Sequence, residues 1–207
     1  MSRTFYIADD HELLRIGTIS YIEKKSDWLC KGNADSPKAA LSDLELLSIG
    51  NTLPDLVISD LNFSGDDAGF DFISKLHSLY PDLKIIVYSM FFSAGMVQTA
   101  LENGATGYIS KNAPSTELLE CMENAFSGKT FIQKDLQENL SKFNSFTDAL
   151  TRREKQVMAL IIKNCSNLQI SETLNIRQRA VENYISSIYE KTGINDKKEF
   201  IKRFGKM

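Results

Sequence analysis

Five polar side chains that together suit one kind of chemistry stand directly after short apolar runs. They are Asp9, Asp10, Asp60, Ser89 and Lys111. In an open parallel α/β sheet, ligands bind beyond the carboxyl ends of the strands, because those ends lie along one edge. If each apolar run is a strand of such a sheet, these side chains meet in space, although about a hundred residues separate the first from the last.

The residue types give such a cluster a specific chemistry. Three carboxylates repel one another and recruit a hard divalent cation, and Mg²⁺ prefers oxygen ligands and often shares its shell with a phosphoryl oxygen. A carboxylate beside Mg²⁺ and an ammonium group can attack phosphorus as a nucleophile, which yields an acyl phosphate. The cation and Lys111 would neutralise the transferred group, and the Ser89 hydroxyl would hydrogen-bond its oxygens.

The elements that must position these residues alternate between two hydrophobic periods. Apolar runs predict five strands, at residues 4–8, 28–30, 56–59, 84–88 and 106–109. The runs Leu56–Ile58 and Ile85–Val87 are continuous, which is typical of strands buried on both faces of a parallel sheet. Amphipathic stretches such as Ser115–Phe126 lie between the runs. We therefore predict an α/β domain with a five-stranded, doubly wound parallel sheet over residues 1–127.

Composition excludes several classes of protein. The chain has 207 residues, 43% of them apolar and 25% charged, which are ordinary globular values that fit one or two domains. No apolar run approaches the roughly 18 residues of a membrane span, and Asp9 and Asp10 interrupt the start where a signal peptide would stay apolar. The three cysteines lack metal-binding spacing. We expect a cytoplasmic protein with reduced thiols and no membrane partner.

Charge is distributed unevenly along the chain. Residues 148–207 hold 12 basic and 7 acidic residues, a net charge of +5, and residues 1–147 hold the other 12 basic and 20 acidic residues, a net charge of −8. This asymmetry favours two domains with different partners, and a polyanion is the natural partner of the basic one.

The rear part of the sequence is helical throughout. Thr151–Glu154 and Ser166–Gln169 are capping boxes that begin two helices. A third helix, with apolar residues at Val181, Ile185 and Ile188, ends near Gly193, and a fourth covers Asp196–Arg203. The tight connection between the second and third helices predicts a four-helix helix-turn-helix domain over residues 148–207. Residues 128–147 are interpreted as a linker that contains a short helix at Asp135–Phe143.

Four segments of the front part together resemble the receiver domain of two-component response regulators, which has a flavodoxin-like fold. They are Ile7–His11, Val57–Asn62, Ile86–Ser89 and Gly104–Lys111. The resemblance covers residues 4–127 and implies that Asp60 accepts a phosphoryl group from the phosphohistidine of a sensor histidine kinase. It implies that Asp9, Asp10, Asp60 and the backbone carbonyl of Asn62 hold Mg²⁺. It further implies that Lys111 pairs with the phosphoryl group, that Ser89 is the switch hydroxyl, and that Tyr108 swings inward when Ser89 moves.

The sequence departs from that family beside the acceptor. Phe63–Gly65 stands where the family usually has a Met-Pro pair, and the loop Gly65–Gly69 is one residue longer than usual. His11 adjoins the acidic pair, and we interpret it as a surface or supporting residue rather than as a member of the site.

The rear part resembles the effector domain of LuxR-type regulators over residues 148–204. The matching residues are Leu150–Glu154, Ser166–Asn167, Ile170, Val181–Lys191 and Gly193. The resemblance implies that the third helix enters the major groove of double-stranded DNA. Its exposed face is predicted to carry Arg179, Glu182, Asn183, Ser186 and Glu190.

The DNA contacts expected from this face follow from the side chains. Arg177 and Arg179 suit phosphate or guanine, and Asn183 suits an adenine edge. Glu182 stands where the family often has Lys, and a carboxylate there can accept from a cytosine amine.

We therefore expect a response regulator of the LuxR/FixJ type, which is not an enzyme except that the receiver can catalyse gain and loss of its own phosphoryl group. It would form a homodimer on activation and bind DNA. Two alternatives stay open. One is an adaptor that works without phosphorylation and uses its helix-turn-helix for protein contact. The other is an Asp-nucleophile phosphatase, which typically needs a second Asp where this chain has Asn62.

Overall fold

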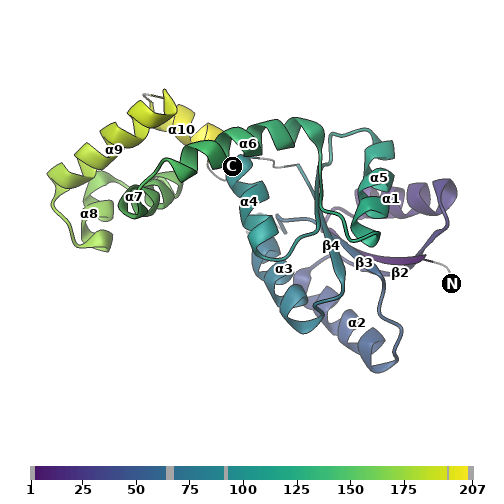
Figure 1. Ribbon diagram of the computed structural model, residues 1–207. Coiled ribbons are helices and arrows are strands. Elements are labelled where there is room, and N and C mark those ends of the chain that lie inside the picture. The colour runs from purple at the N-terminus through teal and green to yellow at the C-terminus, as the bar shows by residue number, and fades with distance from the viewer. Residues whose placement is uncertain (1–2, 64–67, 91–92, 195, 205–207) are drawn as a thin grey trace. The chain divides into compact units, whose positions relative to one another are not determined.

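The structure is a computed structural model that describes residues 3–63, 68–90, 93–194 and 196–204. Residues 65–67 of the loop predicted to be one residue longer than usual lie outside the described residues. The chain divides into two compact units (Figure 1), one made of Met1–Phe92 and Thr99–Gln133 and the other of Ser93–Gln98 and Lys134–Met207.

The first unit is built on a parallel sheet. Its strands are β1 (Arg3–Ala8), β2 (Trp28–Ala34), β3 (Leu56–Ser59), β4 (Lys84–Ser89), β5 (Gly107–Ser110) and β6 (Phe131–Ile132). They lie in the order β2-β1-β3-β4-β5-β6, and every neighbouring pair is parallel. The first five strands have the flavodoxin-like order 2-1-3-4-5 of doubly wound sheets, so the predicted fold class is confirmed.

The predicted number of five strands is wrong by one. Strand β6 pairs with β5, with Phe131 opposite Gly107 and Ile132 opposite Tyr108. It lies inside the stretch interpreted as a linker. A strand of two residues is too short to show an alternating pattern, so the sequence carries no periodic signal for it.

The helices of the first unit cover both faces of the sheet (Figure 1). Helices α1 (Glu12–Lys25) and α5 (Ser115–Phe126) lie on one face, and α2 (Pro37–Ile49) and α3 (Ala68–Leu79) lie on the other. Helix α4 spans Ala94–Glu102. With helices on both sides, Leu56, Val57 and Ile58 of β3 are all at most 1% exposed, which explains why their sequence is continuously apolar.

Gly69, in the first turn of α3, lets this helix approach the backbone that follows β3. Its N–H donates to the carbonyl oxygen of Leu61 at 3.1 Å. A Cβ at position 69 would lie 2.4 Å from both Cα and the carbonyl oxygen of Leu61, a distance that no side chain tolerates. The start of α3 is therefore packed directly against the segment that carries Asp60.

Within the described residues, the second unit contains five helices beyond its short N-terminal segment. They are α6 (Lys134–Asp148), α7 (Arg152–Ile162), α8 (Asn167–Leu174), α9 (Gln178–Thr192) and α10 (Lys197–Phe204). Helix α6 is longer than the short helix expected at Asp135–Phe143. Within the described residues, no helix has both the length and the apolar character to cross a bilayer.

Local sequence signals set the ends of α7 to α9. Thr151 and Ser166 each form a complete capping box, as predicted. Asn175 and Gly193 have positive φ angles of 49° and 67° and end α8 and α9. The buried core of these helices includes Val157, Ile161, Ile170, Val181 and Ile188. The predicted helix-turn-helix arrangement is thereby confirmed.

An ion pair between buried Glu154 and the more exposed Lys191 ties α7 to α9. The Glu154 side chain is 5% exposed, and the Lys191 ammonium lies 2.8 Å from each of its carboxylate oxygens. The Ser187 hydroxyl donates to Glu154 at 2.7 Å. Burial alone would raise the pKa of Glu154, but Lys191, Ser187 and the backbone of Thr151 outweigh it and lower the pKa from 4.5 to about 2.

Candidate functional site

The register of the sheet brings the predicted site residues to one edge. The backbone N–H of Asp9 donates to Ala34, that of Asp60 donates to Ala8, and that of Lys111 donates to Ser89, all at 2.9 to 3.0 Å. Asp9, Asp60 and Lys111 therefore come directly after the ends of their strands, and these ends lie side by side at one edge of the sheet. The convergence follows from parallel pairing and needs no side-chain contact to explain it.

The Lys111 ammonium bridges two of the carboxylates. Its Nζ atom lies 2.7 Å from Oδ2 of Asp9 and 2.6 Å from Oδ2 of Asp60, and the three side chains are at most 5% exposed. Burial by itself lowers the pKa of Lys111, but hydrogen bonds and charges from Asp60 and Asp9 outweigh it, so the pKa is raised. Lys111 therefore stays charged and holds both carboxylates in place.

The Asp60 carboxylate is oriented from both sides. Its Oδ1 atom accepts the backbone N–H of Leu61 at 2.6 Å and that of Asn62 at 3.3 Å, and its Oδ2 atom faces Lys111. The Ser59 hydroxyl donates to the Asp60 carbonyl oxygen at 2.7 Å. A carboxylate held in this way is preorganised for attack on an incoming group, which removes part of the entropic cost of reaction.

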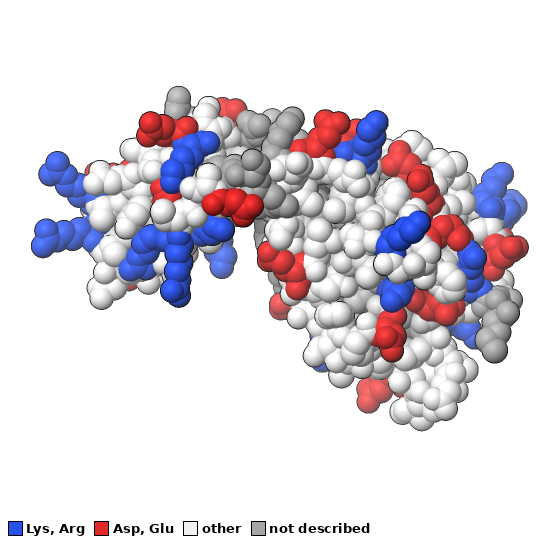
Figure 2. Space-filling view, viewed as in Figure 1, with Lys and Arg blue, Asp and Glu red and all other residues white. Residues whose placement is uncertain are grey.

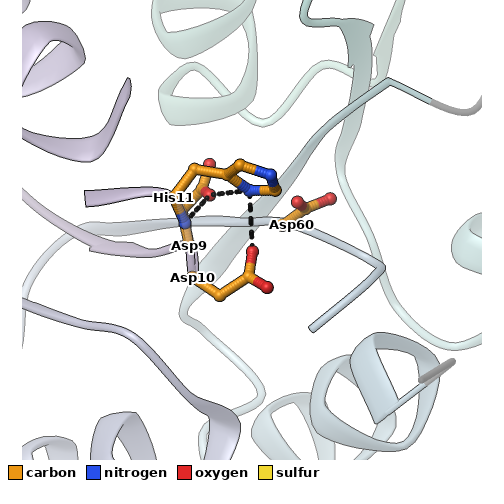
Figure 3. Close-up of side chains that lie close together, drawn as sticks. All are labelled: Asp9, Asp10, His11 and Asp60. Atoms are coloured by element: carbon orange, nitrogen blue, oxygen red, sulfur yellow. Dashed lines mark hydrogen bonds and ion pairs between the residues drawn. The ribbon is translucent and has the colours of Figure 1, made fainter. Parts of the chain in front are cut away.

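Four residues gather their possible ligand atoms into one cluster (Figure 3). These atoms of Asp9, Asp10, His11 and Asp60 all lie within 4.8 Å of one another. In addition, Oδ1 of Asn62 is buried and has no hydrogen-bond partner among the described residues. The Lys111 ammonium contacts two of these three carboxylates, and carboxylates so close together repel one another. The site therefore fits a divalent cation, with Asp9, Asp10, Asp60 and the Asn62 backbone as possible oxygen ligands.

Ser89 and Tyr108 lie next to this cluster. Ser89 ends β4 and Tyr108 is in the middle of the paired segment of β5, and both are fully buried. Burial raises the pKa of the Tyr108 hydroxyl, and the negative charge of Asp60 raises it further, so the phenol stays neutral. Both residues predicted to respond to phosphorylation are thus in the interior, on the two strands nearest Lys111.

Two residues that support the site were missed in the sequence. Arg15 donates from its guanidinium to the Asp9 carbonyl oxygen at 2.5 Å and to Oδ1 of Asn33 at 2.8 Å. Arg15 lies in the first turn of α1. Because helical side chains tilt toward the helix N-terminus, this position alone could have predicted that the guanidinium reaches the end of β1. Gln133 accepts the Ser110 N–H at 3.0 Å, beside Lys111, and no sequence pattern announces this contact.

The residues predicted to contact DNA lie along α9 of the second unit. Arg179, Glu182, Asn183 and Ser186 are exposed, whereas Val181 and Ile188 are fully buried on the opposite side. Arg177 is exposed just before α9, and its side chain makes no capping hydrogen bond. Lys and Arg side chains project from this unit (Figure 2).

Comparisons with known proteins agree with this division. A family model described as the response regulator receiver domain matches residues 5–123, and one described as bacterial regulatory proteins of the luxR family matches residues 148–204. The oxygen regulatory protein NreC of Staphylococcus aureus is 30% identical over 208 residues, which cover 94% of this chain and 93% of that protein.

Solved structures share the fold. RcsB from Salmonella enterica serovar Typhimurium, bound to a promoter in the presence of the phosphomimetic BeF3-, is 22% identical with a TM-score of 0.75 and covers 99% of this chain and 98% of that chain. A LuxR-family two-component response regulator from Aurantimonas sp. SI85-9A1 is 21% identical with a TM-score of 0.62, covering 70% of this chain and 99% of that chain.

Proposed function

The chain belongs to the response regulators that join a receiver domain to a LuxR-type helix-turn-helix domain, and from that premise we propose that phosphorylation of Asp60 switches its binding to DNA. In this proposal residues 1–127 receive the phosphoryl group, residues 128–147, apart from β6, connect the domains, and residues 148–207 contact DNA. The donor is a sensor histidine kinase. Both the kinase domain and the DNA are cytoplasmic, so the protein acts in the cytoplasm.

The observation that carries the proposal is the Lys111 bridge between Asp9 and Asp60. In the transfer, one Asp60 oxygen forms the new O–P bond while the P–N bond to the donor imidazole breaks. The imidazole leaves and takes up a proton. Lys111 is then positioned to follow the added negative charge, because its ammonium already contacts the attacking carboxylate.

Mg²⁺ is the cofactor that we propose for the oxygen ligands of this site. Asp9, Asp10, Asp60 and the Asn62 carbonyl oxygen would hold it, and when bound it supplies positive charge that offsets the phosphoryl oxygens. The chain's own residues would then set the orientation of the acceptor. They would also govern formation and hydrolysis of the acyl phosphate, which is the only catalysis that we assign to the receiver.

The switch proposed for the phosphorylated state uses Ser89 and Tyr108. The Ser89 hydroxyl moves toward the new phosphoryl oxygens, and Tyr108, whose side chain is already buried, packs into the space that this movement leaves. The shift favours a pre-existing conformation that dimerises and binds DNA. A dimer is supported by the RcsB structure described as two dimers bound to two parallel DNAs, which is 21% identical to this chain.

For DNA recognition we propose that α9 lies in the major groove. Arg177 and Arg179 would contact phosphate or guanine, and Asn183 and Ser186 would contact base edges. Glu182 would accept from a cytosine amine, which would make this position selective rather than generally attractive to DNA.

The test combines a small phosphodonor, Mg²⁺ and intact-mass measurement. Wild-type protein should gain one phosphoryl group, Asp60→Asn should gain none, and the matched variant Asp35→Asn, at an exposed position outside the site, should behave as wild type. Phosphorylation of Asp60→Asn would refute the acceptor assignment.

Selection from random DNA duplexes, with and without donor, tests whether phosphorylation controls DNA binding. If the same sequence is selected equally well with and without donor, phosphorylation does not control DNA binding. If no sequence is selected in either case, the adaptor alternative, in which the helix-turn-helix contacts protein, is favoured.

A further inference from the structure

His11 is turned into the acidic cluster rather than away from it (Figure 3). Its Nδ1 atom lies 2.8 Å from Oδ1 of Asp10 and 3.3 Å from Oδ1 of Asp9. The Asp60 carboxylate belongs to the same group of ligand atoms within 4.8 Å. The ring nitrogen therefore faces the same space as the carboxylates assigned to the cation.

The backbone of His11 is anchored beside the cluster. His11 directly precedes α1, in an extended conformation with φ −84° and ψ 95°, and its own N–H donates to Oδ1 of Asp9 at 2.9 Å. Asp9 is in turn held by Lys111. The imidazole thus reaches the cluster from an anchored residue, without any rearrangement of the chain.

We propose that His11 is a direct ligand of the bound ion, which makes the site a mixed oxygen and nitrogen site that favours Mn²⁺ and later first-row divalent ions over Mg²⁺. The proposal rests on the proposed function, since it concerns the same ion. It also revises the interpretation of His11 as a surface or supporting residue.

The spacing of the cluster is compatible with such a ligand. Metal–ligand bonds of about 2.1 Å put neighbouring ligand atoms about 3 Å apart and opposite ones about 4.2 Å apart in octahedral geometry. The separations of Nδ1 from Asp10 and Asp9, and the 4.8 Å extent of the cluster, are close to this range. An ion placed among these atoms would replace the present contacts of the imidazole with the two carboxylates.

Selectivity follows from the ligand type. Mg²⁺ prefers oxygen and keeps several waters, so it gains little from an imidazole. First-row transition ions accept imidazole nitrogen readily, and their affinity for a nitrogen-containing site rises from Mn²⁺ along the series. The His11 side chain is 66% exposed, so the ring lies on the solvent side of the cluster, where it would take a position that a water ligand of Mg²⁺ would otherwise occupy.

The experiment measures ion binding by the full chain. Mn²⁺ and Mg²⁺ are titrated separately by calorimetry, and pulsed electron paramagnetic resonance of bound Mn²⁺ reports nitrogen coupling. Wild type should show imidazole coupling. His11→Phe, which keeps an aromatic ring, should lose the coupling, and its ratio of Mn²⁺ to Mg²⁺ affinity should fall about tenfold. Glu12→Gln, a change at the neighbouring residue, should match wild type in both measurements.

The outcomes separate this inference from the proposed function. If both ions bind, but nitrogen coupling is absent and His11→Phe leaves the affinity ratio unchanged, the His11 assignment is wrong while phosphorylation of Asp60 stands. If neither ion binds, the metal site fails, and the His11 assignment fails with it. Phosphoryl uptake by His11→Phe with Mg²⁺ shows that the variant is folded and that its acceptor is intact.

Discussion

The edge of the sheet and the exposed face of α9 differ in how the residues proposed to function there are held. At the sheet edge, Asp9, Asp60 and Lys111 are almost fully buried and hold one another through contacts of 2.6 and 2.7 Å. On α9, Arg179 and Glu182 are exposed. The site at the sheet edge is therefore assembled by backbone pairing within the chain, whereas the proposed site on α9 is complete only when DNA is bound.

This difference determines what a single substitution can reveal. A change at the sheet edge disturbs buried charges that compensate one another, so the effect should be large and local. A change on α9 alters an exposed group whose energy depends on DNA and salt, so the effect should be smaller and should vary with ionic strength. The predictions below test that contrast, beginning with the largest effect.

Replacing Lys111 by Ala should have the largest effect. The carboxylates of Asp9 and Asp60 lose their shared ammonium, and the transferred phosphoryl group loses a cation, so the rate of phosphoryl uptake should fall about 100-fold. The rate is followed by intact mass after addition of a small phosphodonor. Lys129→Ala, at an exposed position, is the matched control. An unchanged rate in Lys111→Ala would remove the main support for the proposed site.

Replacing Glu154 by Gln tests whether the second unit also depends on a buried charge. Removing the charge should destabilise α7 and α9 by about 2 kcal/mol at pH 7, because Lys191 loses its partner. The pKa of Glu154 is lowered to about 2 in the folded chain, so its stabilising effect is complete above pH 4.5 and is lost as the pH falls toward 2.

Hydrogen exchange of the α7 and α9 amides measures this effect. Wild type and Glu154→Gln should differ most near neutral pH and converge at low pH, while Glu172→Gln, at an exposed position on α8, should follow wild type. Equal protection of Glu154→Gln and wild type at pH 7 would mean that the pair contributes nothing to the presentation of α9.

Two substitutions on α9 should shift DNA affinity in opposite directions. Arg179→Ala should weaken DNA binding about tenfold. It should also make the slope of log affinity against log salt concentration less steep by about 0.9, as expected for one lost phosphate contact. Glu182→Lys should strengthen binding to non-specific DNA and steepen the same plot. The measurement is a salt titration of duplex binding. A flat salt dependence in wild type would indicate that α9 contacts a protein.

Replacing Gln133 by Ala should have the smallest effect. It removes one hydrogen bond from the Ser110 N–H, worth about 1 kcal/mol, so this amide should exchange faster with solvent. Gln133→Glu keeps an acceptor oxygen and should retain most of the protection. If Ala and Glu behave alike, the side chain of Gln133 does not hold the end of β5.

The sequence allowed the fold class and the grouping of Asp9, Asp60 and Lys111 to be predicted for a simple reason. Buried parallel strands leave continuous apolar runs, and the residue after each run is forced to one edge by the register. Neither inference depends on side-chain conformation. The helices around Thr151 and Ser166 were predictable too, because capping boxes are local.

The features that were missed depend on geometry that spacing does not encode. Strand β6 is too short to show a period, and its pairing is set by β5. The orientation of the His11 imidazole depends on one side-chain rotation toward Asp10, and its residue type alone fits a surface position equally well. The extent of α6 beyond Phe143 was missed because its sequence is polar with few apolar residues.

Strand β6 also determines where the protein can be divided for study. A fragment that stops at residue 127 would strip β5 of its outer neighbour and leave the backbone groups of Thr106 and Tyr108, which now accept from Phe131 and Gln133, facing solvent. An unpaired edge strand of this kind can pair with the edge strand of another molecule. A receiver fragment that ends after Gln133 keeps β6 paired with β5 and should remain monodisperse. The fragment that ends at residue 127 should self-associate.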